Sequence, residues 1–208
     1  MTAATKYLSG ACPLMGGLIK RIGPPKLPVD RQSPYESLVR AIAHQQLHAA
    51  AARTITNRFL ALYPGTPFPT PDQVLATDPA ALRACGFSGG KVASILDIAA
   101  KSADGTVPTA RAAARLSDDA LIERLTIIRG VGRWTVEMLL MFSLGRPDIL
   151  PVDDYGVREG YRLLHGLDAQ PKPKQLAALG TLYAPHRSTA SWYLWRAVDA
   201  AKAKAPAA

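Results

Sequence analysis

Residues 117–142 have the pattern of two helices joined by a short turn, and this pattern constrains the fold more than any other part of the chain. Ser117 is a good N-cap, and apolar residues recur after it at helical spacing, so we expect a helix over 117–124 that runs into Thr126. Residues 133–142 are apolar almost all round, which predicts a buried second helix. The chain therefore has to reverse direction within the few residues between these helices.

The turn between the two helices contains Gly130 and Gly132. Glycine allows positive φ angles and the close approach of another molecule to the backbone. A helix that starts directly after such a turn presents free N–H groups and the positive end of its dipole, which suits a phosphate. By itself a Gly-x-Gly turn is more often a plain connection, so the phosphate interpretation depends on the rest of the sequence.

Helical patterns cover most of the remaining chain. Ser33, Pro34 and Glu36 predict an N-cap, a first helical position and a capping box for a helix that reaches Gln45 or Gln46. Further helices are expected over 48–62, 78–86, from about 91 onward, 153–164 and 187–203. Because no convincing alternation with period two is present, we predict an all-α protein.

The composition is that of a globular protein with a basic surface. Of the 208 residues, 48% are hydrophobic, which supports a sizeable core. Lys and Arg outnumber Asp and Glu by 25 to 16, and the resulting charge of +9 favours an anionic partner such as nucleic acid. The basic residues are dispersed, so the fold has to assemble any binding surface.

Two cysteines, Cys12 and Cys85, are too few for a disulfide framework or for a four-cysteine iron–sulfur pattern. We expect free thiols in a reducing compartment. The first residues lack the apolar region of a signal peptide, and no apolar run is long enough to span a bilayer. The expectation is a cytoplasmic protein without a membrane partner.

Residues 150–155 place two adjacent carboxylates, Asp153 and Asp154, before a predicted helix that begins near Tyr155. Either carboxylate could be an ordinary N-cap. Together with three other motifs, however, this segment resembles the helix-hairpin-helix DNA glycosylases, specifically the alkylpurine (DNA-3-methyladenine glycosylase II) branch. The motifs are Ala41-Ile-Ala-His-Gln-Gln46, Arg129-Gly-Val-Gly-Arg-Trp-Thr135, Pro151-Val-Asp153 and Arg187-Ser followed by Trp192-Tyr-Leu-Trp195.

The resemblance covers Ser33 to Trp195 and implies a single compact two-lobed helical fold with a helix-hairpin-helix motif. The middle lobe would span about 35–145, and the segments of about 1–34 and 146–208 would form the other lobe, with 200–208 a frayed tail. The implied activity is that of a monofunctional, monomeric glycosylase of base excision repair. It would flip an alkylated purine, such as 3-methyladenine or 7-methylguanine, out of double-stranded DNA and hydrolyse its N-glycosidic bond.

The resemblance also implies roles for single residues. It places the catalytic aspartate on Asp153, with Asp154 as the rival, because a carboxylate stabilises positive charge on the sugar and can orient a water. Trp134 and Trp195 would be walls of the base pocket that stack on a positively charged purine. Relatives that cleave the DNA strand carry a nucleophilic lysine at the position of Trp134, so we expect this chain to use water.

Gln46 is expected to fill the space that the flipped base leaves in the duplex, with Leu47 as the alternative. The implied phosphate-binding residues of the hairpin are Arg129, Gly130, Val131, Gly132, Arg133 and Thr135. Related proteins hold a monovalent cation, Na⁺ or K⁺, on hairpin carbonyls, and the matching carbonyls are those of Thr126, Ile128 and Val131. No other cofactor and no iron–sulfur cluster is expected.

Three alternatives remain open. His44 and His48 have the spacing of two metal ligands on one helix face, but no third ligand is evident, and a DNA-facing role is the better interpretation. The substrate could be an oxidised, mismatched or deaminated base, since the larger alkylpurine enzymes carry a β-rich domain before this region and only about thirty residues precede Ser33. The chain could also be a catalytically silent DNA-binding module.

Overall fold

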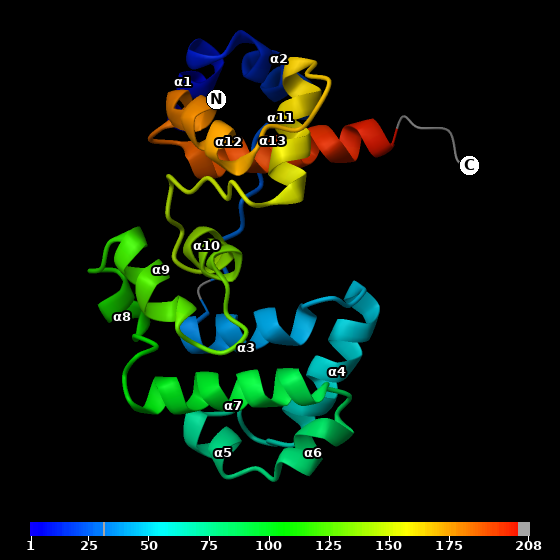
Figure 1. Ribbon diagram of the computed structural model, residues 1–208, viewed down its shortest axis with the longest axis vertical. Coiled ribbons are helices and arrows are strands. Elements are labelled where there is room, and N and C mark those ends of the chain that lie inside the picture. The colour runs from blue at the N-terminus through cyan, green and yellow to red at the C-terminus, as the bar shows by residue number, and fades with distance from the viewer. Residues whose placement is uncertain (31, 204–208) are drawn as a thin grey trace. The chain divides into compact units, whose positions relative to one another are not determined.

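The computed structural model describes residues 1–30 and 32–203, and within this part every regular element is a helix (Figure 1). This confirms the all-α prediction. The chain folds into two compact units. The middle unit comprises Asp30–Leu144, and the terminal unit comprises Met1–Val29 together with Gly145–Ala208. The boundaries predicted between the two lobes from the sequence are near residues 34 and 145.

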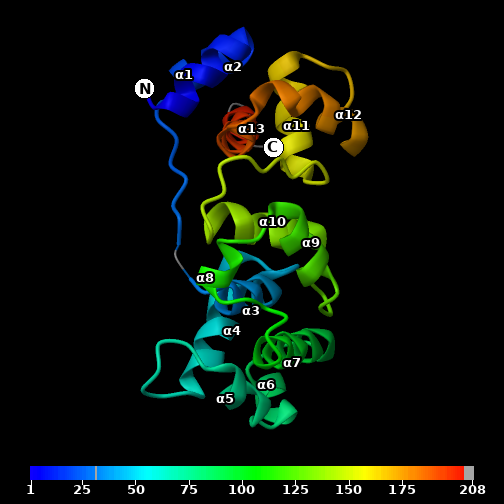
Figure 2. The same ribbon diagram turned by 90° about the vertical axis from the view of Figure 1, so that its left-hand side faces the viewer.

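Within the middle unit, α3 lies between α10 and α7 and also contacts α4 (Figures 1 and 2). The short helices α5 and α6 pack against α7, and α9 packs against α10. The helices of this unit are α3 (Pro34–His44), α4 (Ala49–Ala61), α5 (Pro71–Leu75), α6 (Pro79–Ala84), α7 (Gly89–Ala103), α8 (Ala110–Ala113), α9 (Asp118–Thr126) and α10 (Arg133–Phe142).

The start of α3 follows the predicted N-cap, with one difference. Ser33 Oγ accepts a hydrogen bond from the N–H of Glu36 at 3.1 Å, and Pro34 occupies the first helical position. The predicted capping box is wrong, because the Glu36 carboxylate instead lies 2.8 Å from Arg40 Nη2, one turn further along the helix. The helix also ends earlier than predicted, at His44, with Gln45 as its C-cap.

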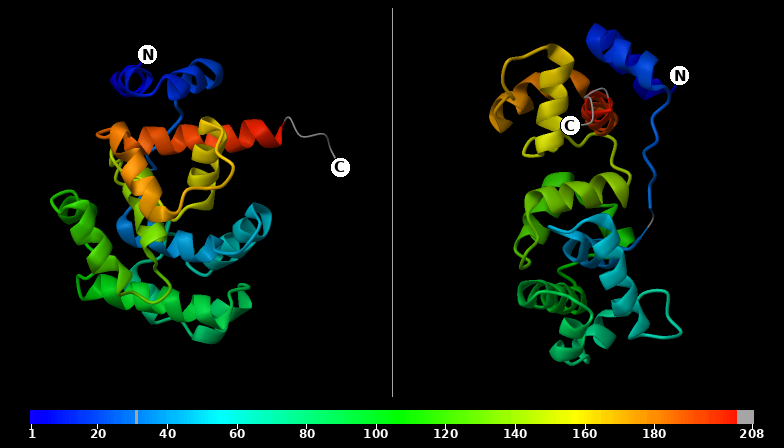
Figure 3. Two further views of the ribbon diagram at one scale, coloured as in Figure 1. Left: turned by 45° about the horizontal axis from the view of Figure 1, so that its top comes forward. Right: turned by 90° about the vertical axis from the view of Figure 1, so that its right-hand side faces the viewer.

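The terminal unit consists of α1 (Ala3–Ala11), α2 (Pro13–Ile22), α11 (Tyr155–His165), α12 (Pro173–Leu179), a 3-10 helix η1 (Gly180–Tyr183) and α13 (Arg187–Lys202). Helix α13 crosses α11, as Figure 3 shows, and also packs against α2. At Gly160 the two backbones approach so closely that a Cβ atom would overlap the carbonyl of Leu194.

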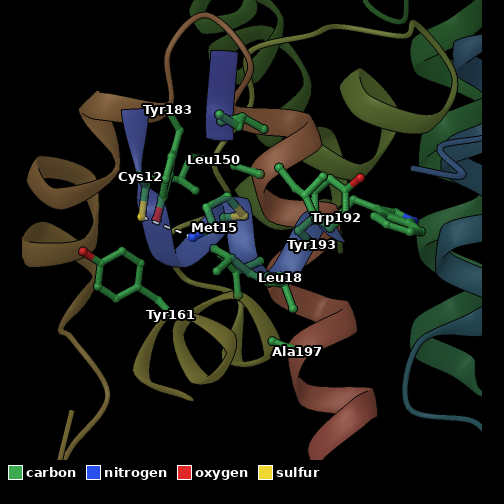
Figure 4. Close-up of a cluster of buried hydrophobic side chains, with 14 of the residues drawn as sticks. Cys12, Met15, Leu18, Leu150, Tyr161, Tyr183, Trp192, Tyr193 and Ala197 are labelled. Atoms are coloured by element: carbon green, nitrogen blue, oxygen red, sulfur yellow. Dashed lines mark hydrogen bonds between the residues drawn. The ribbon is translucent and has the colours of Figure 1, made fainter. Parts of the chain in front are cut away.

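A cluster of apolar side chains from all these helices forms the core of the terminal unit (Figure 4). Tyr183, Tyr193 and Met15 are fully buried in it, and the Tyr193 hydroxyl donates a hydrogen bond to the carbonyl of Gly23 at 2.8 Å. The first 29 residues are therefore part of this core through α1 and α2. Both helices lie outside the helical segments expected from the sequence.

Helix α13 continues to Lys202 and so overlaps the start of the segment 200–208 expected to be a frayed tail, and residues 204–208 lie outside the described residues. Cys12 and Cys85 are buried free thiols, as expected. Among the described residues, no helix has the length and apolar character needed to cross a membrane.

Candidate nucleic-acid interface and base pocket

The hairpin between α9 and α10 is anchored on two other helices of the middle unit. Asp97 of α7 accepts a hydrogen bond from the N–H of Arg129 at 2.7 Å. The carbonyl of Gly130 accepts one from Gln45 Nε2 at 3.2 Å. Gly130 has a φ of +76°, and a Cβ atom there would lie 2.5 Å from Ser94 Oγ of α7. Both the backbone conformation and the close contact therefore require glycine at this position.

Gly132 differs from Gly130 in both conformation and surroundings. Its φ of −93° is open to any residue, so it does not use the positive φ that glycine allows, and a Cβ atom added to it would have no neighbour within 4 Å. Gly132 is the N-cap of α10 and offers no side chain to cap the helix. The first turn of α10 thus keeps its positive dipole end beside an uncrowded surface.

The predicted hairpin residues fall into two groups. Arg129, Gly130, Gly132 and Arg133 are exposed, whereas Val131 and Thr135 are buried. Arg133 pairs with the buried Glu137 one turn later, with Nε 3.0 Å from Oε1. Ile127 at the start of the turn is 66% exposed. The exposed group presents two guanidinium groups and two glycines on one turn.

A pocket of about 690 Å³ lies between α3 and α10, entirely within the middle unit. Its polar wall comes mainly from α3 and the residues after it, with Ser37, Arg40, His44, Gln45 and Gln46, and Asp30 and Gln32 extend this wall before α3 begins. Its apolar wall comes from α10 and includes Trp134, Thr135, Met138, Leu139 and Phe142. The predicted burial of this helix is wrong at Trp134, which is 44% exposed and contributes to the pocket surface.

Gln46 follows the end of α3 in a left-handed conformation. Its φ is +56°, and among the described residues it is the one non-glycine residue with a positive φ. Lys91 of α7 stabilises this helix end, because its Nζ donates hydrogen bonds to the carbonyls of Ala43 at 2.9 Å and Gln45 at 2.7 Å. Burial lowers the pKa of Lys91. Gln46 and its neighbour Leu47 are both exposed.

The structure separates the two adjacent aspartates of the terminal unit. Asp154 is the N-cap of α11, and its Oδ1 accepts hydrogen bonds from the N–H of Val157 at 2.7 Å and from Trp195 Nε1 at 2.8 Å. Asp153 precedes it in the turn, with an exposed side chain. The capping role that either residue could have filled belongs to Asp154. Trp195, the second tryptophan expected in a base pocket, is thus bound to this same carboxylate.

His44 and His48 do not share a helix face, because α3 ends at His44 and His48 is the N-cap of α4. Among the described residues, no group of three or more His, Cys, Asp or Glu side chains is arranged to hold a metal ion.

Comparison with known proteins places this geometry in a family. Residues 39–185 match the model of the HhH-GPD superfamily of base excision DNA repair proteins. The chain belongs to the HhH-GPD superfamily. This match includes the hairpin, most of the residues that line the pocket between α3 and α10, and the Asp154 cap.

Several DNA-3-methyladenine glycosylases are similar to this protein over nearly the whole chain. The DNA-3-methyladenine glycosylase 1 of Schizosaccharomyces pombe is 45% identical over 94% of this chain and 87% of its own length. The solved structure of a 3-methyladenine DNA glycosylase of that species with abasic DNA superposes with a TM-score of 0.84, covering 94% of this chain and 96% of that one. A DNA-3-methyladenine glycosidase of Bacillus halodurans is 32% identical with a TM-score of 0.89, covering 98% and 92%.

Two supporting residues of this HhH-GPD protein could not be found from sequence patterns. Asp97 holds the hairpin from 32 residues away, and Lys91 holds the end of α3 from 46 residues away. Both lie on α7, whose helical pattern is recognisable, but their partners are backbone groups that carry no side-chain signature. The spacing of Lys91 and Asp97 within one helix gives no indication of these contacts.

Proposed function

We infer that this protein is a monofunctional DNA-3-methyladenine glycosylase that acts in base excision repair. It hydrolyses the N-glycosidic bond of alkylated purines, such as 3-methyladenine and 7-methylguanine, in double-stranded DNA. The observation that carries this inference is Trp134, an exposed indole on the apolar wall of a pocket beside the hairpin. An alkylated purine with a positive charge is attracted to an indole face by stacking and by cation–π interaction. The charge of +9 suits a DNA partner, and a DNA substrate fits the cytoplasmic location expected from the sequence.

The carboxylate that assists bond cleavage is proposed to be Asp154 instead of Asp153. Breaking the N-glycosidic bond develops positive charge on the sugar, and a carboxylate in a fixed position stabilises that charge best. Asp154 Oδ1 is held by both the α11 N-terminus and the Trp195 indole, whereas Asp153 is exposed in a turn. One carboxylate oxygen can remain a cap while the other faces the sugar, so capping and catalysis are compatible on Asp154.

Water is the proposed nucleophile. Trp134 occupies the first turn of α10, where the strand-cleaving relatives that the sequence resembles carry a lysine, and an indole cannot form an imine with the sugar. Base release then leaves an intact abasic strand.

The hairpin is proposed to hold the DNA backbone. The uncapped first turn of α10 and the exposed Arg129 and Arg133 favour a phosphate. A monovalent cation on the carbonyls of Thr126, Ile128 and Val131 would fit the same turn, because Thr126 ends α9 and the negative dipole end of a helix attracts cations. When bound, such a cation would supply positive charge that attracts a DNA phosphate.

Gln46 is proposed to enter the duplex at the space left by the flipped base. Its side chain projects from an exposed turn at the rim of the Trp134 pocket, and Lys91 holds the carbonyl of the preceding residue. Leu47 stays the alternative, since it is 38% exposed on the same turn.

A pair of asparagine variants tests the catalytic assignment. Asp154→Asn keeps an oxygen that can cap α11 and accept the Trp195 N–H, because asparagine is as good an N-cap as aspartate. It removes the negative charge, so single-turnover release of 3-methyladenine should fall by about 100-fold or more, while binding to DNA with an abasic-site analogue is retained. Asp153→Asn is the matched control and should release the base at close to the wild-type rate.

Two other outcomes are informative. If Asp153→Asn is inactive and Asp154→Asn is normal, the catalytic carboxylate is the one expected from the sequence. A wild-type protein that binds duplex DNA but releases no base from methylated, oxidised or deaminated DNA would be a silent binding module. Release of oxidised or deaminated bases alone would assign a different lesion.

A further inference from the structure

The pocket beside Trp134 has two chemically different walls. Helix α10 supplies apolar side chains around Trp134, and α3 supplies a polar wall that includes Arg40 and His44. Arg40 and His44 are four residues apart on one helix and therefore share a face. A purine that stacks on Trp134 within this pocket has polar groups of α3 within reach of its edges.

Most of the polar side chains on this wall are already bound within the protein. Ser37 Oγ lies 2.7 Å from Ser143 Oγ, so the two hydroxyls share a hydrogen bond. Arg40 Nε donates to Glu36 Oε1 at 2.9 Å. Gln45 Nε2 donates a hydrogen bond to the hairpin carbonyl of Gly130. Gln32 Nε2 donates to Asp30 Oδ2 at 2.7 Å, so the two polar residues before α3 are bound to each other. All these groups have partners before any ligand arrives.

His44 differs from its neighbours on the wall. Within the described ranges 1–30 and 32–203, no residue forms a hydrogen bond with its imidazole, and the side chain is exposed at the pocket. Gln46 is likewise an exposed polar side chain of this wall, but its proposed role is to enter the DNA duplex. His44 is therefore the polar group of the wall that a base in the pocket can engage.

The electrostatic surroundings of His44 suit a positively charged base. Burial lowers the pKa of His44, and the positive charges of Arg40 and Lys91 lower it further. The imidazole is thus uncharged at neutral pH and does not repel a cationic purine. Depending on its tautomer, an uncharged imidazole can accept a hydrogen bond from a 6-amino group or donate one to a 6-oxo group.

We propose that His44 is a specificity-determining residue whose imidazole hydrogen-bonds the 6-substituent of an alkylated purine stacked on Trp134. This inference rests on the proposed glycosylase function. His44 can bind both alkylated adenine and alkylated guanine, because its imidazole can accept a hydrogen bond from a 6-amino group or donate one to a 6-oxo group. A group that only donates would favour the 6-oxo purine.

Three variants of the full chain test the proposal, using one preparation of methylated duplex DNA that contains both 3-methyladenine and 7-methylguanine. His44→Ala should lower the single-turnover release of both bases by about tenfold, the loss of one hydrogen bond to a charged group. His44→Gln keeps a donor and an acceptor and should stay within about threefold of the wild-type rates. His44→Lys only donates, so it should lower the ratio of 3-methyladenine to 7-methylguanine release.

Binding to duplex DNA with an abasic-site analogue is the control, because that DNA has no base for His44 to contact. It should be unchanged in His44→Ala and His44→Gln. Wild-type release rates in His44→Ala would overturn the proposal, and so would an equal loss of abasic-DNA binding, which would place His44 on the DNA backbone. If the wild-type protein releases no methylated purine, the proposed glycosylase function is overturned, and the role of His44 that rests on it is overturned with it.

Discussion

Single residues in this protein have sharply different surroundings although they are adjacent in sequence. Asp153 and Asp154 are chemically identical, yet one is exposed in a turn and the other is held by a helix N-terminus and an indole. His44 and Gln45 likewise lie side by side, but Gln45 is bound to the hairpin and His44 faces the pocket. In both pairs, consecutive side chains point in different directions from the backbone, so one residue is held by hydrogen bonds and its neighbour is exposed.

The lowered pKa of His44 predicts an acid dependence of base release. Burial and the positive charges of Arg40 and Lys91 oppose protonation of the imidazole, and the acidic residue that lines the same pocket is Asp30. Because the folded-state pKa lies below the ordinary 6.5, His44 stays uncharged at pH 7 and becomes charged only as the pH falls through that lower value. The ratio of wild-type to His44→Gln release rates should therefore be constant from pH 8 to 6.5 and fall at more acidic pH.

Taking this ratio cancels other titrating groups, including the catalytic carboxylate, since both proteins share them. A ratio that stays flat down to pH 5 would show that the charge of His44 does not affect base release.

At the scale of elements, the helix-hairpin-helix uses its two glycines for different purposes. Gly130 is required by its positive φ and by its contact with Ser94, so it belongs to the folding of the hairpin. Gly132 has an ordinary φ and open space around it, so it leaves the first turn of α10 accessible. A substitution at Gly130 would disturb the fold of the hairpin, so a loss of DNA binding could not be assigned to the phosphate site. A substitution at Gly132 leaves the fold of the hairpin intact and avoids this problem.

Gly132→Ala is therefore the better test of the phosphate-binding hairpin. The added methyl group should keep a phosphate away from the N–H groups of α10 and weaken binding to damaged and undamaged duplexes alike, by about tenfold for one charge-assisted hydrogen bond. Affinity for both duplexes is measured after circular dichroism has shown that the helical content is unchanged. Unaltered affinity for both would reject the hairpin as the phosphate site.

In the whole molecule, the residues with proposed roles in binding and catalysis are divided between the two units. The middle unit carries the hairpin, Gln46 and Trp134, and the terminal unit carries Asp154 and Trp195. Lys91, the internal lysine that we consider first as an alternative nucleophile, uses its Nζ to hold two carbonyls at the end of α3. The amine is therefore engaged in structure.

The whole protein should release bases without cleaving the DNA strand. Breaks should appear only after alkali or an added abasic endonuclease, and borohydride should fail to trap the protein on DNA, because no imine forms. The N-terminal amine is acetylated in a parallel sample, since Met1 is 90% exposed. Efficient trapping that survives acetylation and disappears in Lys91→Met would overturn the water mechanism.

Much of this fold follows from local sequence patterns. Helix caps such as Ser33 and Ser117 and the apolar periodicity after them are short-range signals, and they predict the helices that carry the site to within a few residues. The Gly-x-Gly turn and its flanking helices are also recognisable, because backbone reversal needs particular residues at fixed positions. Helices α1 and α2, by contrast, were not predicted, although they complete the core of the terminal unit.

The all-α class, the helix-hairpin-helix and the residue types of the site follow from the amino-acid sequence, since these depend on neighbours within one or two turns of the chain. Three other properties follow from the packing of helices: Asp154 caps α11 and binds Trp195, Trp134 is exposed at a pocket, and Gln45 is bound to the hairpin while the His44 imidazole faces the pocket. These properties depend on contacts between helices far apart in sequence. The Trp195 indole contacts Asp154 only after α13 has packed on α11. The hairpin carbonyl of Gly130 contacts Gln45 only after α10 has packed on α3.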